Sequence, residues 1–393
     1  MYNVYQHWDP LKVCVVGRSY PPDYYCWMTD ARVRSLFEKI ALETEEDYQY
    51  LIKKLQEFGV QVLRPELPAF EDIKIGGKYL PPPMTPRDYM IMIGEVFYKG
   101  YQLDIEKFYK AVKDPSWPDC TSVEEFSTLP QHIQDECNDL HNLKKLQKFY
   151  SSYDKIYDQI QQAGNQVVKN VISQAPGAFI TRVGKDLYFG TETYSQNHIQ
   201  YKQQIDSVFT ETRNHIVNTG GHSDATFCPV CPGLIISLKD VPTYADTFPG
   251  WEVVYLPNQS WSKIKPFVQL KQKNNGKWWI PGFENDQSVI DTVEQWLGHW
   301  TGYVEETVFD VNMLIIDPKN VMVFNYNKQV FDALDRYGIT PHVVPFRHRY
   351  FWDGGLHCIT SDLDREGEQK DFFPDRKNQI YIYEKKTDKP VIK

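Results

Sequence analysis

The repeat that decides the fold is clearest in VNMLIIDPKNVMVFNYNKQVFDALDRYGITPHVVPF, residues 311–346. Val311–Ile316 and Val321–Phe324 are apolar, strand-like runs, and the Pro-Lys-Asn segment between them is typical of a turn. Lys328–Tyr337 places apolar residues at the spacing of a helix face and is followed directly by a glycine. His342–Phe346 can then return as a closing strand. The stretch therefore predicts one strand–turn–strand–helix–strand unit.

Looser copies of this pattern occur elsewhere in the chain. They share the order of strands, turns and helices, but not the amino-acid sequence. The runs are Ala178–Val183 with Leu187–Phe189, Ala225–Val230 with Leu234–Ser237, and Val13–Gly17 followed by a helix through Tyr48 to Phe58 and by Val60–Leu63. A unit repeated in this way predicts a closed, repeat-built α/β architecture. An ordinary mixed sheet is the alternative that the pattern leaves open.

We interpret residues 1–393 as a single domain with one interruption. Residues 101–166 are polar, aromatic and helix-leaning, unlike the strand-rich stretches on either side. They predict a helical insertion, or a lid on the core, with helices at His141–Tyr150 and Tyr153–Gln162.

Composition and charge limit the class of protein. The net charge of −9 excludes an overall basic surface for nucleic acid. We find no apolar run of about 18 residues and no signal-peptide pattern, so we expect no membrane span and a cytoplasmic location. The seven cysteines are an odd number in a long chain, which favours reduced thiols over a disulfide scaffold.

Two segments could carry chemistry. In GLHCITSD, residues 355–362, Cys358 follows glycine and histidine and could be a nucleophile at the mouth of a sheet. Taken alone, a cysteine is more often a small buried apolar residue. In GGHSDATF, residues 220–227, His222 and Asp224 would face one pocket if the segment were a strand, because strand side chains alternate. The alternative is a turn with a hydrogen-bonded histidine.

Three further segments also allow simpler interpretations. Pro86-Arg87-Asp88 places an acid at the edge of a strand, although a plain surface turn also fits. Cys228-Pro229-Val230-Cys231 has no second cysteine pair to complete four zinc ligands, so we interpret it as strand and turn, without a metal. Gly184-Lys185-Asp186 lacks the spacing of a phosphate-binding loop.

Taken together and in this order, these segments resemble the glycine/inosamine amidinotransferase family. The resemblance covers most of the chain outside the predicted insertion. The segments on which the resemblance rests are Trp8–Leu11 through Val16–Arg18, Pro86-Arg87-Asp88, Gly184-Lys185-Asp186, His222–Phe227, Asn312–Val323 and Gly354–Cys358.

The resemblance implies a fold and a set of roles. The implied fold is the pentein α/β-propeller, with five strand–strand–helix–strand (ββαβ) units around a pseudo-fivefold axis. The implied nucleophile is Cys358 and the implied acid/base is His222. Asp88 and Asp224 would clamp the guanidinium by charge-assisted hydrogen bonds. Arg87 joins them among the predicted substrate-binding residues.

Three features depart from the family pattern. The acidic partner of the catalytic histidine is missing, and Gln174 is the nearest candidate to orient that ring. Val241 falls near the position at which the family has an arginine that binds the substrate carboxylate. Glu305 and Glu306 fall near the position of a serine pair in the family. We include both glutamates in the predicted substrate site, where they would repel a carboxylate and favour a second cationic group.

The sequence thus predicts an amidinotransferase that moves an amidino group from a guanidino donor to an amine acceptor through an amidino-cysteine. Neither a metal nor an organic cofactor is needed, and the partners are small molecules rather than nucleic acid or membranes. The family often forms homodimers, a state on which these residues carry no signal. Two alternatives remain: a guanidino-group hydrolase (deiminase or dihydrolase) of the same fold, and a binding protein that has lost turnover.

Overall fold

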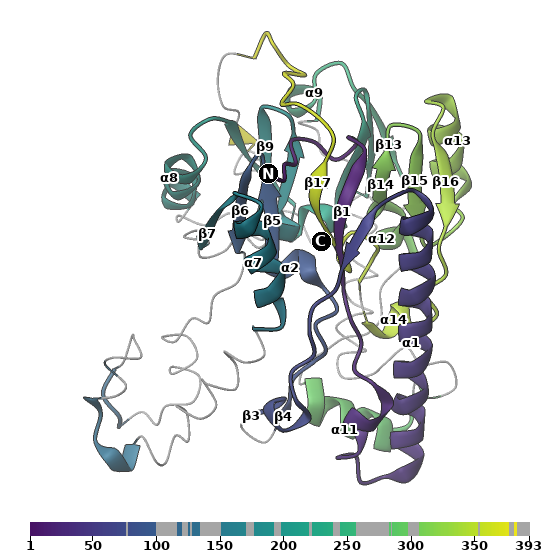
Figure 1. Cartoon of the computed structure of the whole chain (residues 1–393). Helices are drawn as coiled ribbons and strands as arrows, with labels where there is room; N and C mark the ends of the chain where they lie inside the picture. The colour runs from purple at the N-terminus through teal and green to yellow at the C-terminus, as the bar shows by residue number, and fades with distance from the viewer. Residues whose placement is uncertain are drawn as a thin grey trace, which may run out of the picture.

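Five small sheets repeat one arrangement of strands in this computed structural model (Figure 1). In each, the first strand pairs antiparallel with the second, and the second pairs parallel with the third. A helix connects the second strand to the third, which is the predicted unit. The structure describes residues 1–75, 78–99, 116–119, 125, 128–133, 151–169, 177–191, 198–219, 222–238, 244–256, 283, 285–297, 306–352, 354–376 and 381–382.

Four units follow one another along the chain. Unit A is β5 (Met90–Ile93), β6 (Val96–Lys99), α7 (Asp154–Gln162) and β7 (Gln166–Lys169). Unit B is β8 (Ile180–Val183), β9 (Asp186–Thr191), α8 (His198–Val208) and β10 (Arg213–Asn218). Unit C is β11 (Phe227–Cys231), β12 (Leu234–Ser237), α9 (Tyr244–Thr247) and β13 (Glu252–Tyr255). Unit D is β14 (Leu314–Asp317), β15 (Asn320–Val323), α13 (Lys328–Arg336) and β16 (Thr340–Val343).

Both ends of the chain build the fifth unit. Unit E takes its first strand, β17 (Thr360–Arg365), from the C-terminal part, and β1 (Leu11–Val16), α1 (Ala31–Glu57) and β2 (Gln61–Leu63) from the N-terminal part. Figure 1 shows β17 and β1 side by side, as their antiparallel pairing requires. The repeat is therefore complete only when the two ends meet. The predicted five-unit pentein architecture is confirmed.

The remaining elements lie between or beside the units. They are η1 (Pro22–Tyr25), η2 (Phe70–Asp72), β3 (Lys74–Ile75), β4 (Lys78–Tyr79), α2 (Pro86–Tyr89), η3 (Ser151–Tyr153), η4 (Gly177–Phe179), η5 (Ser223–Ala225), α11 (Gln287–Leu297), α12 (Glu306–Val311), α14 (Arg349–Trp352) and β18 (Tyr381–Ile382). The last strand, β18, extends the sheet of unit B by pairing with β10. Among the helices that the structure describes, none is long and apolar enough to cross a membrane.

Two boundaries differ from the sequence-based expectation. Val311 was expected to begin a strand, but it ends the helix α12, and β14 begins at Leu314. The helix α7 falls inside the predicted insertion 101–166, yet it belongs to unit A, because its buried face packs on the same core cluster as β5 and β6. An insertion in unit A therefore ends before Ser151. The predicted helix His141–Tyr150 lies outside the described residues.

A buried ionic cluster ties the first strands together. The carboxylate of Asp362 on β17 accepts hydrogen bonds from three buried guanidinium groups: Arg87 at 2.8 Å, Arg182 at 2.7 and 2.8 Å, and Arg365 at 2.6 Å. Burial alone would raise the pKa of Asp362, but these three cations hold it well below its ordinary value. We call these four residues the Asp362 cluster.

The arginines of the Asp362 cluster also bind the backbone of neighbouring strands. Arg182, from β8, donates to the carbonyl oxygen of Met92 on β5 at 2.6 Å. Arg365 donates to the carbonyl oxygen of Ile315 on β14 at 2.9 Å. First strands from units A, B, D and E are thus joined around one carboxylate.

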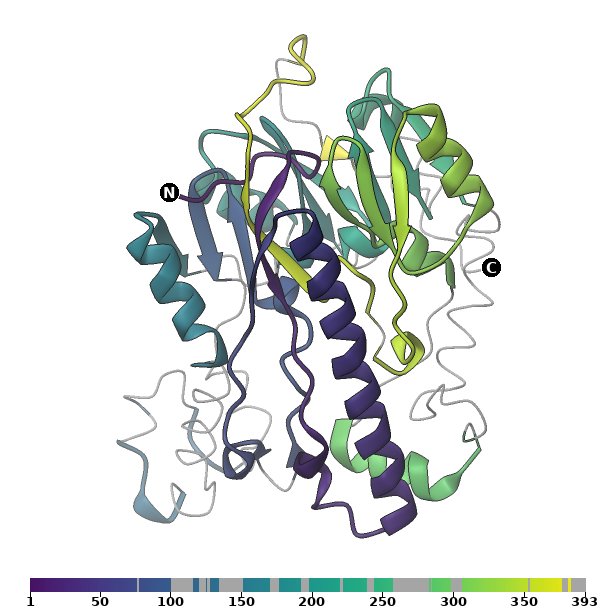
Figure 2. The same cartoon turned by 45° about the vertical axis from the view of Figure 1, so that its right-hand side comes forward.

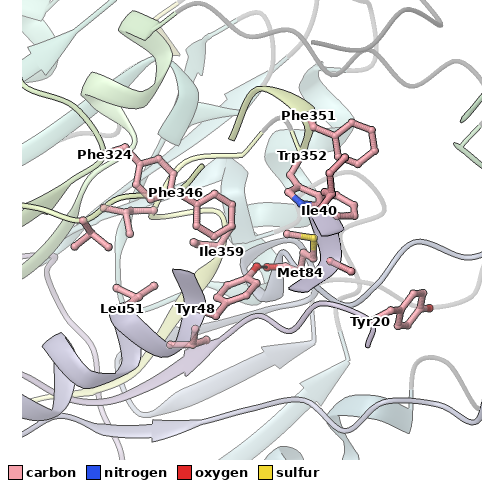
Figure 3. Close-up of a cluster of buried hydrophobic side chains, with 14 of the residues drawn as sticks. Tyr20, Ile40, Tyr48, Leu51, Met84, Phe324, Phe346, Phe351, Trp352 and Ile359 are labelled. Carbon is pink, nitrogen blue, oxygen red and sulfur yellow. Dashed lines mark hydrogen bonds between the residues drawn. The ribbon is translucent and has the colours of Figure 1, made fainter. Parts of the chain in front are cut away.

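The long helix α1 packs over the outer side of unit E, as the turned view in Figure 2 shows. Asp30 caps its N-terminus by accepting hydrogen bonds from the backbone N–H groups of Arg32 and Val33. Figure 3 shows Tyr48 of this helix among buried side chains that include Met84 and Ile359. The Tyr48 hydroxyl donates to the Met84 carbonyl oxygen at 3.2 Å.

Gly17 allows three backbone segments to meet beside this cluster. Its N–H group donates to the carbonyl oxygen of Ile359 at 2.9 Å. A Cβ at position 17 would lie only 1.9 Å from the Met84 carbonyl oxygen, so no larger residue fits without a backbone shift. The end of β1 therefore anchors the segments that carry Asp88 and Cys358.

We expect Asp362→Asn to lower the free energy of unfolding by about 3–5 kcal/mol, because removing one partner leaves buried charges uncompensated. Urea denaturation of the full chain measures this change. The control is Glu366→Gln, which removes the exposed partner of Lys12 and should leave the midpoint near that of the wild type. Equal midpoints for the two variants would contradict the importance of the Asp362 cluster.

Candidate active site

A short turn or helix precedes the first strand of every unit. These lead-in segments are α2 before β5, η4 before β8, η5 before β11, α12 before β14, and the turn at 356–359 before β17. They pack against one another: η4 contacts α2 and η5, α12 contacts η5, and α2 contacts β17. Side chains from segments far apart in sequence therefore meet at one end of the five-unit repeat.

Cys358 lies at the centre of these segments. Its Sγ atom is 3.8 Å from Oδ2 of Asp224 and accepts a hydrogen bond from the side-chain amide of Asn312 at 3.1 Å. The Asn312 carbonyl Oδ1 accepts the backbone N–H groups of His357 and Cys358 at 2.8 and 3.1 Å. Asn312 thus fixes both the sulfur and the backbone of the cysteine turn.

Gly355 is required for this close approach. A Cβ at Gly355 would lie 2.4 Å from both Cβ and Oδ1 of Asn312. The glycine that precedes the His-Cys pair therefore makes room for the side chain that holds the cysteine.

Two carboxylates, one buried and one partly buried, lie near the cysteine. Asp224, in η5, is 6% exposed, and its Oδ2 pairs with Nδ1 of His357 at 2.8 Å. Asp88, in α2, is close enough to interact electrostatically with both Asp224 and His222. One oxygen of each acid, Oδ1, is buried without a hydrogen-bond partner among the described residues. Such atoms are costly to leave unpaired, and two of them beside one thiol indicate a site for a ligand rich in N–H donors.

The two carboxylates have opposite pKa shifts. Burial raises the pKa of Asp88 above its ordinary value, and the neighbouring charge of Asp224 adds to the rise. Burial also acts on Asp224, but the hydrogen bond from His357 and the charges of His222 and Arg87 bring its pKa below the ordinary value. Of the two acids, Asp224 therefore has the stronger tendency to be ionised.

The surroundings of the Cys358 sulfur favour its protonated form. Burial raises the pKa of its thiol well above the ordinary value, and Asp224 and Asp88 raise it further. The hydrogen bond from Asn312 opposes this rise. A cation bound between the two carboxylates would offset part of their effect and favour the thiolate.

His222 caps the other side of the site. It is the N-cap residue of η5, and its ring makes an edge contact with Phe179 at a centroid distance of 4.8 Å. The segment is positioned by Ser223, whose hydroxyl donates to the Ala178 carbonyl oxygen at 3.0 Å. His222 and Asp224 lie at the start of a 3₁₀ turn, near enough to interact electrostatically, rather than in the strand whose alternation was expected to align them.

Of the other residues predicted for the site, the structure describes Arg87 and Glu306. Arg87 is fully buried, donates to Asp362, and contacts the cysteine turn through its backbone N–H, which reaches the Cys358 carbonyl oxygen at 3.4 Å. Glu306 begins the helix α12. Gln174, Glu305 and Val241 lie outside the described residues.

Sequence reasoning missed Asn312 and His357 as site residues. Both were within quoted motifs, but nothing in their identity separates them from ordinary buried polar residues. The overlooked signal is the repeat itself. Asp88, Asn312 and Cys358 each stand two residues before the first strand of their unit. That register would have selected Asn312.

Cys228 and Cys231 both lie in β11, and the prediction that they form part of a strand agrees with this placement. Burial raises the pKa of the Cys228 thiol to about 12 and that of Cys231 to about 11. Within the part of the chain that the structure describes, no group of three or more histidine, cysteine and carboxylate side chains is arranged to hold a metal ion.

The chain is similar to known proteins in sequence and in fold. No protein-family model matches the chain. It is 22% identical over 409 residues to the mitochondrial glycine amidinotransferase of Xenopus tropicalis, covering 94% of this chain and 84% of the relative. Two solved structures share its fold with a TM-score of 0.58 and cover 95% of this chain and 99% of their own. They are the inosamine-phosphate amidinotransferase StrB1 of Streptomyces griseus, 16% identical, and SxtG of Microseira wollei, an amidinotransferase of saxitoxin biosynthesis, 17% identical.

The sequence alignment spans nearly the whole chain, and the solved structures share its five-unit fold. Three of the motifs that led to the prediction, Pro86-Arg87-Asp88, His222–Phe227 and Gly354–Cys358, include lead-in segments. The chain is therefore similar over nearly its whole length to glycine amidinotransferase and shares the fold of the inosamine-phosphate amidinotransferase, both from the family that its motifs resemble.

Proposed function

We propose that this protein is an amidinotransferase that works through an amidino group carried on Cys358. One observation carries the residue-level proposal: Asp88 and Asp224 each bring a buried, unpaired carboxylate oxygen to the surroundings of the Cys358 sulfur. A guanidinium group is planar, cationic and rich in N–H donors, so it satisfies both oxygens at once. Its central carbon would then face the nucleophile.

The first half of the reaction forms the covalent intermediate. Binding of the guanidinium brings one positive charge between the two acids, which offsets part of their effect on the thiol and favours the Cys358 thiolate. The sulfur attacks the central carbon, and the C–N bond to the donor breaks. The proton from the thiol passes through His222 to the departing amine, which leaves as a neutral molecule. A cationic amidino-cysteine remains between Asp88 and Asp224.

The second half reverses these steps with a new amine. The acceptor nitrogen attacks the amidino carbon, His222 takes its extra proton, and the C–S bond breaks. The proton returns to the sulfur, so the cysteine is regenerated and a new guanidinium is released. Water in place of the amine would make the same site a hydrolase, and product analysis with and without an amine separates the two reactions.

Arg87 has an indirect role in this proposal. Its guanidinium is committed to Asp362, so we assign it to holding the turn of Cys358 against α2 rather than to binding substrate directly. Its positive charge lowers the pKa of both Asp88 and Asp224, which helps to keep the pair ionised.

The nucleophile can be tested by comparing cysteines. We expect Cys358→Ala to abolish transfer, and Cys228→Ala and Cys231→Ala to retain most of it, because those two thiols lie in the strand β11, whereas Cys358 lies in the turn beside Asn312 and Asp224. Intact-mass measurement after incubation with guanidino compounds should show one added amidino group, which peptide mapping assigns to Cys358. An adduct on Cys228, or a dead Cys228 variant, would show that the site is misassigned.

The carboxylate clamp makes a separate prediction. In a Cys358→Ser background, Asp88→Asn and Asp224→Asn should each weaken donor binding by on the order of 2–5 kcal/mol, the usual effect of losing a desolvated charged partner. Titration calorimetry measures the affinity. His222→Gln should leave donor binding largely intact while stopping turnover in the Cys358 protein.

The control for the clamp is Asp364→Asn, on β17 six residues after Cys358, whose carboxylate accepts the backbone N–H of Asn3. It should bind donor like the parent. Normal affinity in both clamp variants would remove Asp88 and Asp224 from the binding site.

Donor identity is the least constrained part of the proposal. We propose that Glu305 and Glu306 favour a guanidino compound or amine that lacks a free carboxylate, such as agmatine or a polyamine, because like charges in one pocket repel. Kinetics with arginine and agmatine side by side, with and without Glu306→Ser, provide the test. A clear preference for arginine that Glu306→Ser leaves unchanged would end this substrate proposal without affecting the mechanism.

Assembly and location stay predictions. We expect a homodimer, which sedimentation velocity of the purified chain would detect. We also expect a cytoplasmic location, although several relatives are named as mitochondrial proteins. Fractionation of cells that express the chain would decide between these compartments.

A further inference from the structure

His357, the residue before the proposed nucleophile, turns its ring toward Asp224. Its Nδ1 atom lies 2.8 Å from Oδ2 of Asp224, and the residue is 8% exposed. The same Oδ2 is the oxygen that stands 3.8 Å from the Cys358 sulfur. The other oxygen of Asp224, Oδ1, is the one left for the donor.

The hydrogen bond has a defined direction. An ionised carboxylate has no proton to give, so Nδ1 of His357 must donate it. Burial and the charge of Arg87 lower the pKa of His357 below its ordinary value, although Asp224 acts against them. At a pH above the ordinary pKa of histidine, the ring is therefore neutral and carries its proton on Nδ1. It orients the carboxylate without cancelling the negative charge that attracts a guanidinium.

A small cavity of about 20 Å³ lies on the inner side of His357. Its polar lining side chains are His7, Thr181, Asp224, Cys228, His357 and Arg365. Nε2 of His357 is buried and has no partner among the residues that the structure describes. A cavity of this size holds about one water molecule, whose O–H group would satisfy Nε2 and keep the proton on Nδ1.

His7 packs against the ring of His357 and helps to enclose the cavity. Its ring meets His357 edge-on at a centroid distance of 5.5 Å, and its Nε2 accepts the backbone N–H of Arg182 at 3.1 Å. Burial and the charge of Arg182 hold the pKa of His7 well below its ordinary value, so a second neutral ring closes the cavity.

We propose that His357 is a positioning residue for amidino transfer: its Nδ1–H group holds one oxygen of Asp224, so that the other oxygen faces the guanidinium of the donor. This inference rests on the proposed role of Asp224 in donor binding. It differs from the role of His222, because His357 moves no proton and touches no reacting atom.

The proposal concerns pH, so all groups that face Asp224 matter. They come from α2, η5 and its preceding turn, β11 and the cysteine turn, and they are Arg87, Asp88, His222, Cys228, His357 and Cys358. All except His357 and the substituted cysteine are unchanged between the variants compared below. Only a displacement of the pH profile from one variant to another is therefore informative.

The test measures donor binding to the Cys358→Ser protein by calorimetry at a series of pH values, from about pH 8 down to the lowest pH at which the protein stays folded. Loss of the His357 hydrogen bond raises the pKa of Asp224, so the carboxylate is lost at a higher pH. We expect His357→Leu to weaken binding about 10- to 100-fold near the acid end, the usual effect of losing a hydrogen bond to a charged group, with partial recovery as pH rises.

His357→Asn provides a rescue, because an amide can place an N–H donor near the position of Nδ1. As pH falls, this variant should lose donor binding at close to the same pH as the parent protein. The matched control is His215→Leu, which removes another buried histidine paired with an acid, Asp186, at 2.6 Å in unit B. That variant should lose stability but keep the parent's pH profile of binding.

The outcomes separate this inference from the proposed function. If the parent binds no guanidino compound, the proposed function fails. If the parent binds and His357→Leu loses donor binding at the same pH as the parent, the positioning role of His357 is wrong. That role is also wrong if His357→Asn is displaced as far as His357→Leu, or if His357→Leu still weakens binding in an Asp224→Asn background.

Discussion

The carboxylate of Asp362 binds three buried guanidinium groups, and the rest of the architecture is arranged around that contact. Charges without water are costly unless they are paired, so each arginine must keep its position relative to the carboxylate. The same arginines bind carbonyl oxygens on β5 and β14. A shift of one unit against the next would therefore break several buried polar contacts at once. This constraint fixes the first strands with respect to one another.

The site inherits its geometry from this cluster. Asp362 lies four residues after Cys358 on the same segment, and Arg87 is next to Asp88 in α2. Arg87 thus connects the Asp362 cluster to both the nucleophile and one arm of the clamp. From the outer side, the packing of Tyr48 and Gly17 holds Met84 and Ile359, which flank the same two segments.

Different surroundings give the two carboxylates, Asp88 and Asp224, different pKa shifts. Asp224 has a neutral hydrogen-bond donor and a lowered pKa, whereas burial raises the pKa of Asp88. Together they raise the pKa of the Cys358 thiol until a cation arrives. These shifts favour a protonated Cys358 in the free protein, and in the proposed mechanism a cationic substrate supplies the charge that activates it.

The sequence by itself determined the repeat, because alternating apolar runs, turn residues and helical spacing are local properties that residues 311–346 carry without help. It also supplied Cys358, His222, Asp88 and Asp224, through motifs whose order matched a known family. It could not reveal that Asn312 holds the sulfur, that His357 pairs with Asp224, or that Arg87 is committed to Asp362. Those contacts join residues separated by 46, 133 and 275 positions, and they exist only after the ends of the chain close the fifth unit. The hydrogen-bond partner of a buried polar group is decided by that closure, which no local pattern encodes.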